Sequence, residues 1–295
     1  MADKSLSIKF IERKIRNLAK LSTLPFVASR VMEMVENPRT SASQLCEIIS
    51  TDQVMAARIL RLANSAYYGF PRKISTLNLA IVVLGFNALR DLVLSISLID
   101  RFALQNKEII DLKQFWRHVL IVGIGSKLLA KYLNYPIIGE VFVGGLLHDI
   151  GYLVMYQHFP EEFNRIYEFA KTNNISFDEA GRIELGVSHT EMGAWLAEGW
   201  NLPHKLVQSI KYHHLPSKSL NYQDLISFIY LADLISYSID EGNGILTRKE
   251  ISESEIENLI KELFPRSRYS LKFFQNKFIE EVEKIEEFLA ILDSN

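Results

Sequence analysis

Histidine and aspartate side chains in the second half of this chain are candidates for binding metal ions. The sequence has 7 histidines, and the first of them is His118. His148 and Asp149 are adjacent and follow a run of small and apolar residues, Gly144-Gly-Leu-Leu. Asp233 lies inside an apolar segment, Ile229-Tyr-Leu-Ala-Asp-Leu-Ile. A buried carboxylate without a counter-charge is costly, so such a group usually lies beside a cation, a proton or strong hydrogen-bond donors.

Neutral imidazoles mixed with carboxylates suit a transition metal better than the all-oxygen site that magnesium prefers. Successive helical residues point about 100° apart, so His148 and Asp149 can converge on one ion only beside a helix end. A carboxylate has two oxygens, so Asp149 can bridge two ions. Two ions about 3.5–4 Å apart can clamp a phosphoryl group and activate water. We therefore take His148 and Asp149 as candidate catalytic residues for metal-dependent hydrolysis of a phosphate ester.

Each of these residues also has a structural interpretation when it is taken alone. His118 is typical of a core histidine on an apolar helix face. His213 and His214 could end a solvated helix, where a protonated imidazole interacts well with the helix dipole. Asp233 could pair with an arginine. The metal hypothesis therefore depends on the joint pattern of residues and not on any single one.

The elements that must position these residues are predicted to be helices. Apolar spacing and cap residues indicate helices over residues 115–133, 138–148, 203–213, 223–239, 253–264 and 271–292. Capping-box patterns begin at Ser41, Ser176 and Ser188. We see no strand-like alternation of useful length, and we expect an all-α protein with a subdomain boundary near residues 105–112.

Composition narrows the class of protein further. The 14 Gly and 8 Pro in 295 residues fall well below the usual combined fraction of about 12 %, which argues against a many-stranded β fold. A net charge of −2 argues against a dedicated nucleic-acid binder. The single cysteine, Cys46, excludes an intrachain disulfide and a cysteine-based metal site. No apolar run reaches the roughly 20 residues that a membrane span needs, so we expect a cytoplasmic protein with no membrane partner.

The ordered set of histidines and aspartates resembles the ligand pattern of the HD superfamily of metal-dependent phosphohydrolases. Motifs elsewhere in the chain resemble the HDOD (HD-related output domain) family, and together the likenesses cover roughly residues 17–240. The HDOD-like motifs are Leu24-Pro-Phe-Val, Ile48-Ile-Ser-Thr-Asp-Gln, Ile59-Leu-Arg-Leu-Ala-Asn-Ser-Ala-Tyr-Tyr-Gly, Ala80-Ile-Val-Val-Leu-Gly and the segment 193–203.

This resemblance implies a two-part all-helical fold, in which an N-terminal helical bundle packs on an HD-like bundle. The implied parts are an HDOD subdomain over residues 1–110, a metal-binding HD-like subdomain over 111–240 and a helical extension over 241–295. It also implies a bacterial regulatory or signalling role, with a partner protein or a nucleotide or phosphodiester ligand.

With His189 included, the ligand set resembles that of the HD-GYP phosphodiesterases, which cleave cyclic di-GMP. The resemblance implies one or two divalent transition metals: Fe, Mn, Ni or Zn. By this likeness Asp149 bridges two metal ions, one held by His118, His148 and Asp233 and the other by His189, His213 and His214.

Two departures from the HD-GYP pattern leave the activity open. Tyr152 stands where those enzymes have a lysine, and Leu215-Pro-Ser-Lys-Ser replaces their Gly-Tyr-Pro stretch. Two interpretations remain: a metal-dependent phosphohydrolase or phosphodiesterase, and a non-catalytic interaction scaffold with a vestigial or structural HD site.

Overall fold

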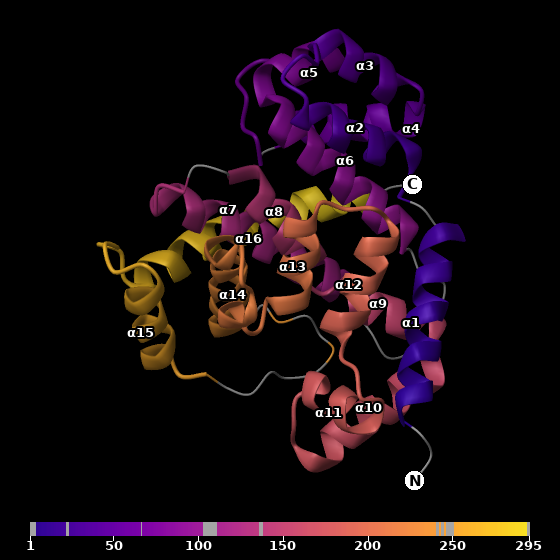
Figure 1. Ribbon diagram of the computed structural model, residues 1–295. Coiled ribbons are helices and arrows are strands. Elements are labelled where there is room, and N and C mark those ends of the chain that lie inside the picture. The colour runs from indigo at the N-terminus through magenta and orange to yellow at the C-terminus, as the bar shows by residue number, and fades with distance from the viewer. Residues whose placement is uncertain are drawn as a thin grey trace. The chain divides into compact units, whose positions relative to one another are not determined.

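The computed structural model describes residues 4–21, 24–65, 67–102, 111–135, 138–239, 242, 245 and 251–293. Within these residues the regular elements are α-helices and one short 3₁₀ turn, with no strand (Figure 1). The predicted all-α class is confirmed. No single described helix is both long enough and apolar enough to cross a bilayer, although the bent pair Leu77–Leu84 and Phe86–Arg101 reaches that composition jointly.

The chain forms two compact units, which are described separately. Residues 1–22 and 104–279 form one, called here the histidine unit, and residues 23–103 and 280–295 form the other, called here the HDOD-motif unit. The predicted division into residues 1–110, 111–240 and 241–295 stays a prediction, because residues 110, 240 and 241 lie outside the described part of the chain.

The HDOD-motif unit is a bundle of five helices, together with the last part of α16. In the bundle α2 packs on α3 and α6, while α4 packs on α5 and α6. Leu45, Ile59 and Leu62 are fully buried in its core. The buried Arg58 forms an ion pair of 2.5 Å with Asp100 and so ties α4 to α6. The five helices are α2 (Phe26–Glu36), α3 (Ala42–Ser50), α4 (Gln53–Ala63), α5 (Leu77–Leu84) and α6 (Phe86–Arg101).

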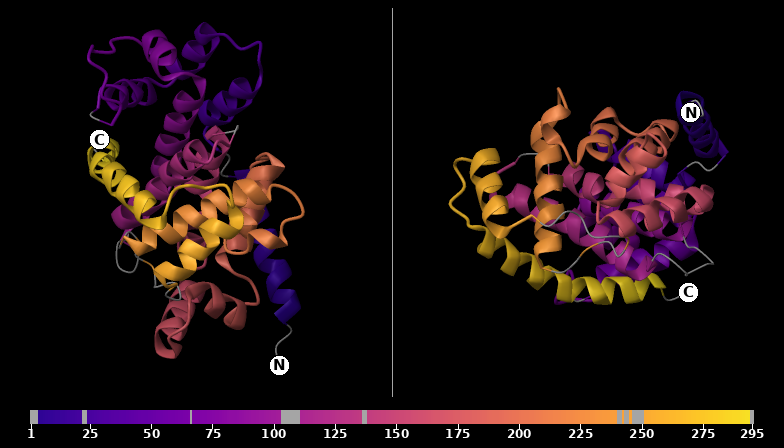
Figure 2. Two further views of the ribbon diagram at one scale, coloured as in Figure 1. Left: turned by 90° about the vertical axis from the view of Figure 1, so that its left-hand side faces the viewer. Right: turned by 90° about the horizontal axis from the view of Figure 1, so that it is seen from below.

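The histidine unit contains the remaining helices. In it α7 packs on α8 and α14, and α12 packs on α1, α9 and α13 (Figures 1 and 2). The helices are α1 (Lys4–Leu21), α7 (Leu112–Tyr132), α8 (Ile138–Leu147), α9 (Ile150–His158), α10 (Pro160–Asn173), α11 (Phe177–Glu184), α12 (His189–Gly199), α13 (His204–Tyr212), α14 (Gln223–Ser238), α15 (Glu253–Leu263) and α16 (Leu271–Asp293), of which residues 271–279 belong to this unit.

Local sequence signals set where these helices begin. Ser41 and Ser188 each form the complete capping box that the sequence predicts, with Gln44 and Glu191 respectively. At Ser176 one half of the predicted capping box is recorded: the hydroxyl accepts a hydrogen bond from the backbone N–H of Glu179. The six helices predicted by range in the second half all occur, with ends that differ from the predicted ones by at most three residues.

Two glycines allow the close helix contacts that bring distant histidines together. A Cβ atom on Gly145 of α8 would lie 2.7 Å from the Cα of Gly123 on α7, so these two helices approach at their backbones. A Cβ on Gly151 of α9 would collide with the backbone carbonyl of His189 at the start of α12. Small residues at these two points therefore position the ends of α8 and α9 against α7 and α12.

Candidate metal centre

All seven predicted ligands lie in the histidine unit, at the points where its helices meet. His118 lies within α7, His148 follows α8, and Asp149 is the N-cap of α9. His189 is the first residue of α12, and His213 is the C-cap of α13. The remaining two are His214 and Asp233, the latter within α14. The four imidazoles of His118, His148, His189 and His213 are 0 % exposed, and only His214 is partly exposed.

The ligands fall into two groups, each with its ligand atoms within 4.8 Å of one another. The first group is His118, His148 and Asp233. The Oδ1 atom of Asp233 lies 3.3 Å from Nε2 of His118 and 3.8 Å from Nε2 of His148.

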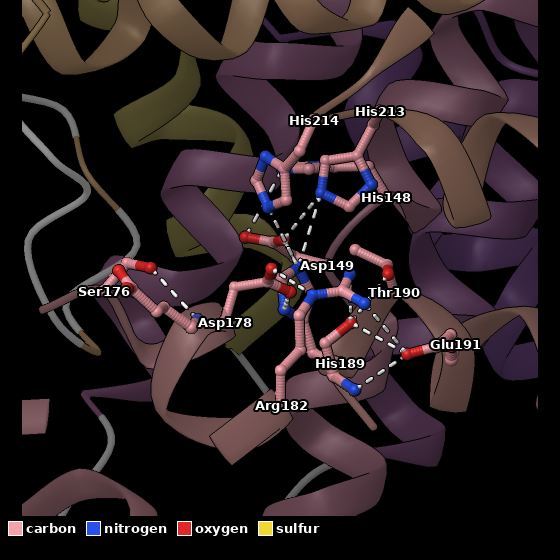
Figure 3. A network of polar contacts seen from close by, with 12 residues as sticks. His148, Asp149, Ser176, Asp178, Arg182, His189, Thr190, Glu191, His213 and His214 are labelled. Atoms are coloured by element: carbon pink, nitrogen blue, oxygen red, sulfur yellow. Dashed lines mark hydrogen bonds and ion pairs between the residues drawn. The ribbon is translucent and has the colours of Figure 1, made fainter. Parts of the chain in front are cut away.

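The second group is Asp149, His189, His213 and His214. The Nε2 atom of His189 lies 3.4 Å from Nε2 of His213 and 3.3 Å from Nε2 of His214 (Figure 3). Three imidazole nitrogens thus point at one small volume, which is the arrangement that a tetrahedral or octahedral metal ion requires of its ligands.

The carboxylate of Asp149 faces both groups at once. Its Oδ2 atom lies 3.3 Å from Nε2 of His148 and 3.8 Å from Nε2 of His118. Its Oδ1 atom lies 3.3 Å from Nε2 of His189 and 3.5 Å from Nε2 of His213. One oxygen is therefore available to each group, as a bridging carboxylate requires.

Hydrogen bonds on the far side of three imidazole rings decide which nitrogen faces the centre. Nδ1 of His148 donates to the carbonyl of Gly145 at 2.6 Å, and Nδ1 of His213 donates to the carbonyl of Ile210 at 2.8 Å. The hydroxyl of Ser236 donates its hydrogen to the backbone carbonyl of Asp233. The Ser236 oxygen can therefore only accept from Nδ1 of His118. In the neutral ring the proton therefore sits on Nδ1, and the Nε2 lone pair points inward.

The short distances between the buried nitrogen and oxygen atoms of the cluster favour bound metal ions. Inward-facing Nε2 lone pairs lie 3.3–3.8 Å from carboxylate oxygens and 3.3–3.4 Å from one another. Lone pairs held this close in a buried site repel one another unless positive charge lies between them. Protons or divalent cations can supply that charge, and they compete for the same atoms.

The electrostatics of the cluster agree with this demand for positive charge. Burial alone raises the pKa of Asp149, but the charge of His148 and hydrogen bonds from the surrounding imidazoles hold it well below its usual value. Burial alone lowers the pKa of His189, but its hydrogen bonds to Asp149 and Asp178, together with their charges, raise it to about 9. Burial lowers the pKa of His213 below its usual value, and positive charge on His148 and His189 adds to that shift.

Comparison with known proteins identifies the family. The family model described as "HDOD domain" matches residues 21–216. The chain belongs to the HDOD domain family. The likeness of the seven ligands to the HD-GYP set stays a prediction, because the family match extends to HDOD and not to HD-GYP.

Solved structures share the fold of this HDOD protein. An "HDOD domain protein with unknown function" from Geobacter sulfurreducens has a TM-score of 0.80 at 23 % identity, covering 97 % of this chain and 98 % of that one. A "Putative phosphohydrolase" from Shewanella amazonensis SB2B has a TM-score of 0.75 at 26 % identity, covering 96 % and 97 % of the two chains.

A curated relative, an "Uncharacterized protein" from Treponema pallidum (strain Nichols), is 29 % identical over 226 residues. The match covers 75 % of this HDOD protein but 44 % of the relative, so the chain spans less than half the length of that protein.

Tyr152, the departure noted in the sequence, packs directly on the centre of this HDOD protein. Its ring stacks on the imidazole of His189 with centroids 4.0 Å apart and planes 14° apart. It also contacts Phe177 edge-on and is buried. The position therefore supplies an aromatic wall to the ligand His189, where a lysine would supply a cation.

Asp178 contributes to the centre although the sequence did not single it out. Its Oδ1 atom lies 3.3 Å from Nδ1 of His189, and Arg182 donates to its Oδ2 atom at 3.1 Å (Figure 3). Arg182 also donates to the hydroxyl of Ser188 at 3.0 Å. A carboxylate on the far nitrogen of a ligand histidine fixes the ring's orientation and raises its basicity. No sequence signal separates Asp178 from the other acidic residues on helices. Only its position beside His189 in the folded chain shows that it belongs to the site.

Proposed function

We propose that this HDOD protein binds two divalent transition-metal ions in its histidine unit and uses them to hydrolyse a phosphate ester as part of a regulatory role. The observation that carries the proposal is the placement of Asp149, whose two carboxylate oxygens face two separate histidine groups. The structural relative from Shewanella amazonensis SB2B, which carries the name "Putative phosphohydrolase", supports the same class of reaction.

The chain offers a complete ligand set for this role. His118, His148 and Asp233 would hold one ion, and His189, His213 and His214 the other, with Asp149 between them. Two such ions supply Lewis-acid activation of a phosphoryl group and of water. Histidine nitrogens with carboxylates favour iron, manganese, nickel or zinc.

The chain's own groups would orient the reacting atoms. Hydrogen bonds from Nδ1 of His148 and His213 to backbone carbonyls keep both rings fixed, so no reorganisation is needed when a substrate arrives. His214 is the one partly exposed ligand, so substrate would approach from its side. The buried ring of Tyr152 shields His189 from water on one face.

Metal content tests the proposal directly. We expect full-length protein purified without chelator, then loaded with Mn²⁺ or Fe²⁺, to hold two ions per chain by elemental analysis. Asp149→Ala removes the shared carboxylate and is expected to lower this to one or none. His204→Ala is the matched control, because His204 begins α13 but belongs to neither ligand group. Wild-type protein without bound metal, or equal loss in both variants, would contradict the proposal.

A second candidate function is a metal-stabilised interaction module without turnover. Tyr152 favours it, because a buried ring stacked on His189 occupies a position where HD-GYP enzymes have a lysine to bind phosphate. Hydrolysis of bis(p-nitrophenyl) phosphate and cyclic dinucleotides by the metal-loaded protein distinguishes the two functions. Turnover that is lost in Asp149→Ala supports the hydrolase, and metal-loaded protein without turnover on either class supports the module.

A further inference from the structure

A cavity in the histidine unit carries an inference that is independent of the metal centre. The cavity has a volume of about 800 Å³, within the range of small-molecule sites, which is about 300–1,000 Å³. Its walls are residues 131–134 at the C-terminal end of α7 and residues 263–269, which run from the last residue of α15 into the connection to α16. None of the seven candidate metal ligands lines it.

Three cations line this cavity, and no acidic residue does. They are Lys131, Arg266 and Arg268. Among the residues that the structure describes, none of the three forms an ion pair, whereas Arg58, Arg165 and Arg182 of the same chain do. Lys131 lies in the last turn of α7, where the helix dipole offsets part of its charge. Arg266 and Arg268 lie in the connecting segment, outside any helix. Two guanidinium groups that form no ion pair within the described part of the chain attract anions to one concave wall.

Aromatic rings form the rest of the wall. Tyr132 and Tyr269 meet edge to face with centroids 5.1 Å apart. Phe264 also lines the cavity, and its ring is stacked on that of Phe228. The guanidinium of Arg268 lies 5.2 Å from the ring centroid of Tyr269 and donates to its hydroxyl at 3.1 Å. One face of Tyr269 is stacked on Phe273, with centroids 4.5 Å apart and planes 24° apart. The wall thus places aromatic rings immediately beside groups that bind phosphate.

This combination fits one class of ligand. Guanidinium groups bind phosphate oxygens in a bidentate manner, and aromatic side chains stack on nucleobases. We propose that the cavity binds a nucleotide, with its phosphates at Arg266, Arg268 and Lys131 and its base against Tyr132 and Tyr269. A simple anion would use only the cations, and a nucleoside would use only the rings.

Equilibrium dialysis of the full-length protein with ADP and GDP tests this proposal, with adenosine and inorganic pyrophosphate as comparison ligands. We expect a nucleoside diphosphate to bind at least about tenfold more tightly than adenosine or pyrophosphate, because only it engages both parts of the wall. Adenosine or pyrophosphate binding as tightly as both nucleotides would overturn the proposal, and so would the absence of binding by ADP and GDP.

Substitutions then locate the site. Arg266→Ala with Arg268→Ala changes two exposed side chains outside the core and is expected to weaken nucleotide binding by about tenfold or more. Lys272→Ala is the matched control, because Lys272 is an exposed cation on α16 that does not line the cavity. Equal affinity in the double variant and the control would overturn the proposal. Charge reversal, Arg266→Glu, changes the charge of the wall by the same amount and should also weaken binding, and unchanged binding there contradicts the assignment.

The Asp149→Ala variant separates this site from the metal centre. We expect it to bind ADP or GDP as wild-type protein does, because Asp149 does not line the cavity. Nucleotide binding that disappears in Asp149→Ala would place the nucleotide at the metal centre and overturn the cavity assignment. If the wild-type protein binds nucleotide but no metal ion, the proposed function is contradicted and the cavity assignment is not.

Discussion

Substitution of Asp178 tests how the second ligand group is held together. The Oδ1 atom of Asp178 lies 3.3 Å from Nδ1 of His189, and Arg182 holds the Asp178 carboxylate. Asp178 is therefore placed to orient the ring whose Nε2 faces Asp149, His213 and His214. Loss of such a carboxylate partner typically weakens metal binding by about 10–100-fold, which corresponds to about 1.4–2.7 kcal/mol.

Two substitutions separate the contribution of the Asp178 charge to metal affinity from the contribution of its hydrogen-bond acceptor. Asp178→Asn keeps an oxygen that can accept from Nδ1 of His189, so we expect a loss near the lower limit, about tenfold. Asp178→Ala removes both charge and acceptor, so we expect a loss near the upper limit, about 100-fold. Glu184→Gln is the control, because Glu184 lies on the same helix, α11, and pairs with Arg165.

The assay is competition between the protein and a metal-binding indicator dye for Co²⁺ or Zn²⁺, with circular dichroism as a check on folding. We expect both Asp178 variants to lose affinity for one of the two ions and to retain the other. If Asp178→Ala folds normally and binds two ions as tightly as wild type, the assigned role of Asp178 is wrong. Equal weakening of both ions would also contradict it, because only the second group contacts Asp178.

Three further predictions follow from the same geometry. Gly151→Ala places a Cβ against the backbone of His189, and we expect it to destabilise the protein by about 1–3 kcal/mol in urea unfolding and to lower its metal content. Leu45→Ala opens a cavity in the HDOD-motif unit, and we expect a loss of about 2–5 kcal/mol with metal stoichiometry unchanged in the folded protein. Removal of metal by a chelator is expected to lower the melting temperature, because a ligand free at 100 times its Kd contributes about 2.7 kcal/mol to stability; an unchanged melting temperature would show that the ions add nothing to folding.

Much of the fold was accessible from local sequence signals. The capping boxes at Ser41 and Ser188 occur as predicted, since their hydrogen bonds form within four residues of chain. The six predicted helix ranges also occur, because apolar periodicity and caps act over a few turns. The candidate site residues could be singled out for a different reason: their types and their order along the chain resemble those of a known superfamily, and the structure brings them together in two adjoining groups.

The role of Asp178 was not accessible in this way. The distance along the sequence between Asp178 and His189 is not distinctive, because many acidic residues stand about as far from a histidine on the next helix. Only the packing of α11 beside α12 brings the Asp178 carboxylate to the imidazole of His189. The basic cavity was likewise hidden, since Lys131 and Arg266 are separated by more than one hundred residues and meet only where α7 ends beside the α15–α16 connection.

The sequence by itself determined the helical class and the chemical identity of the seven candidate ligands, because side-chain type and short-range spacing are properties of the chain. Only the tertiary structure decided how these seven residues divide into two groups and which oxygen of Asp149 faces which group. Those distances depend on backbone contacts at Gly145 and Gly151, across helices far apart in the chain, and no local signal specifies them.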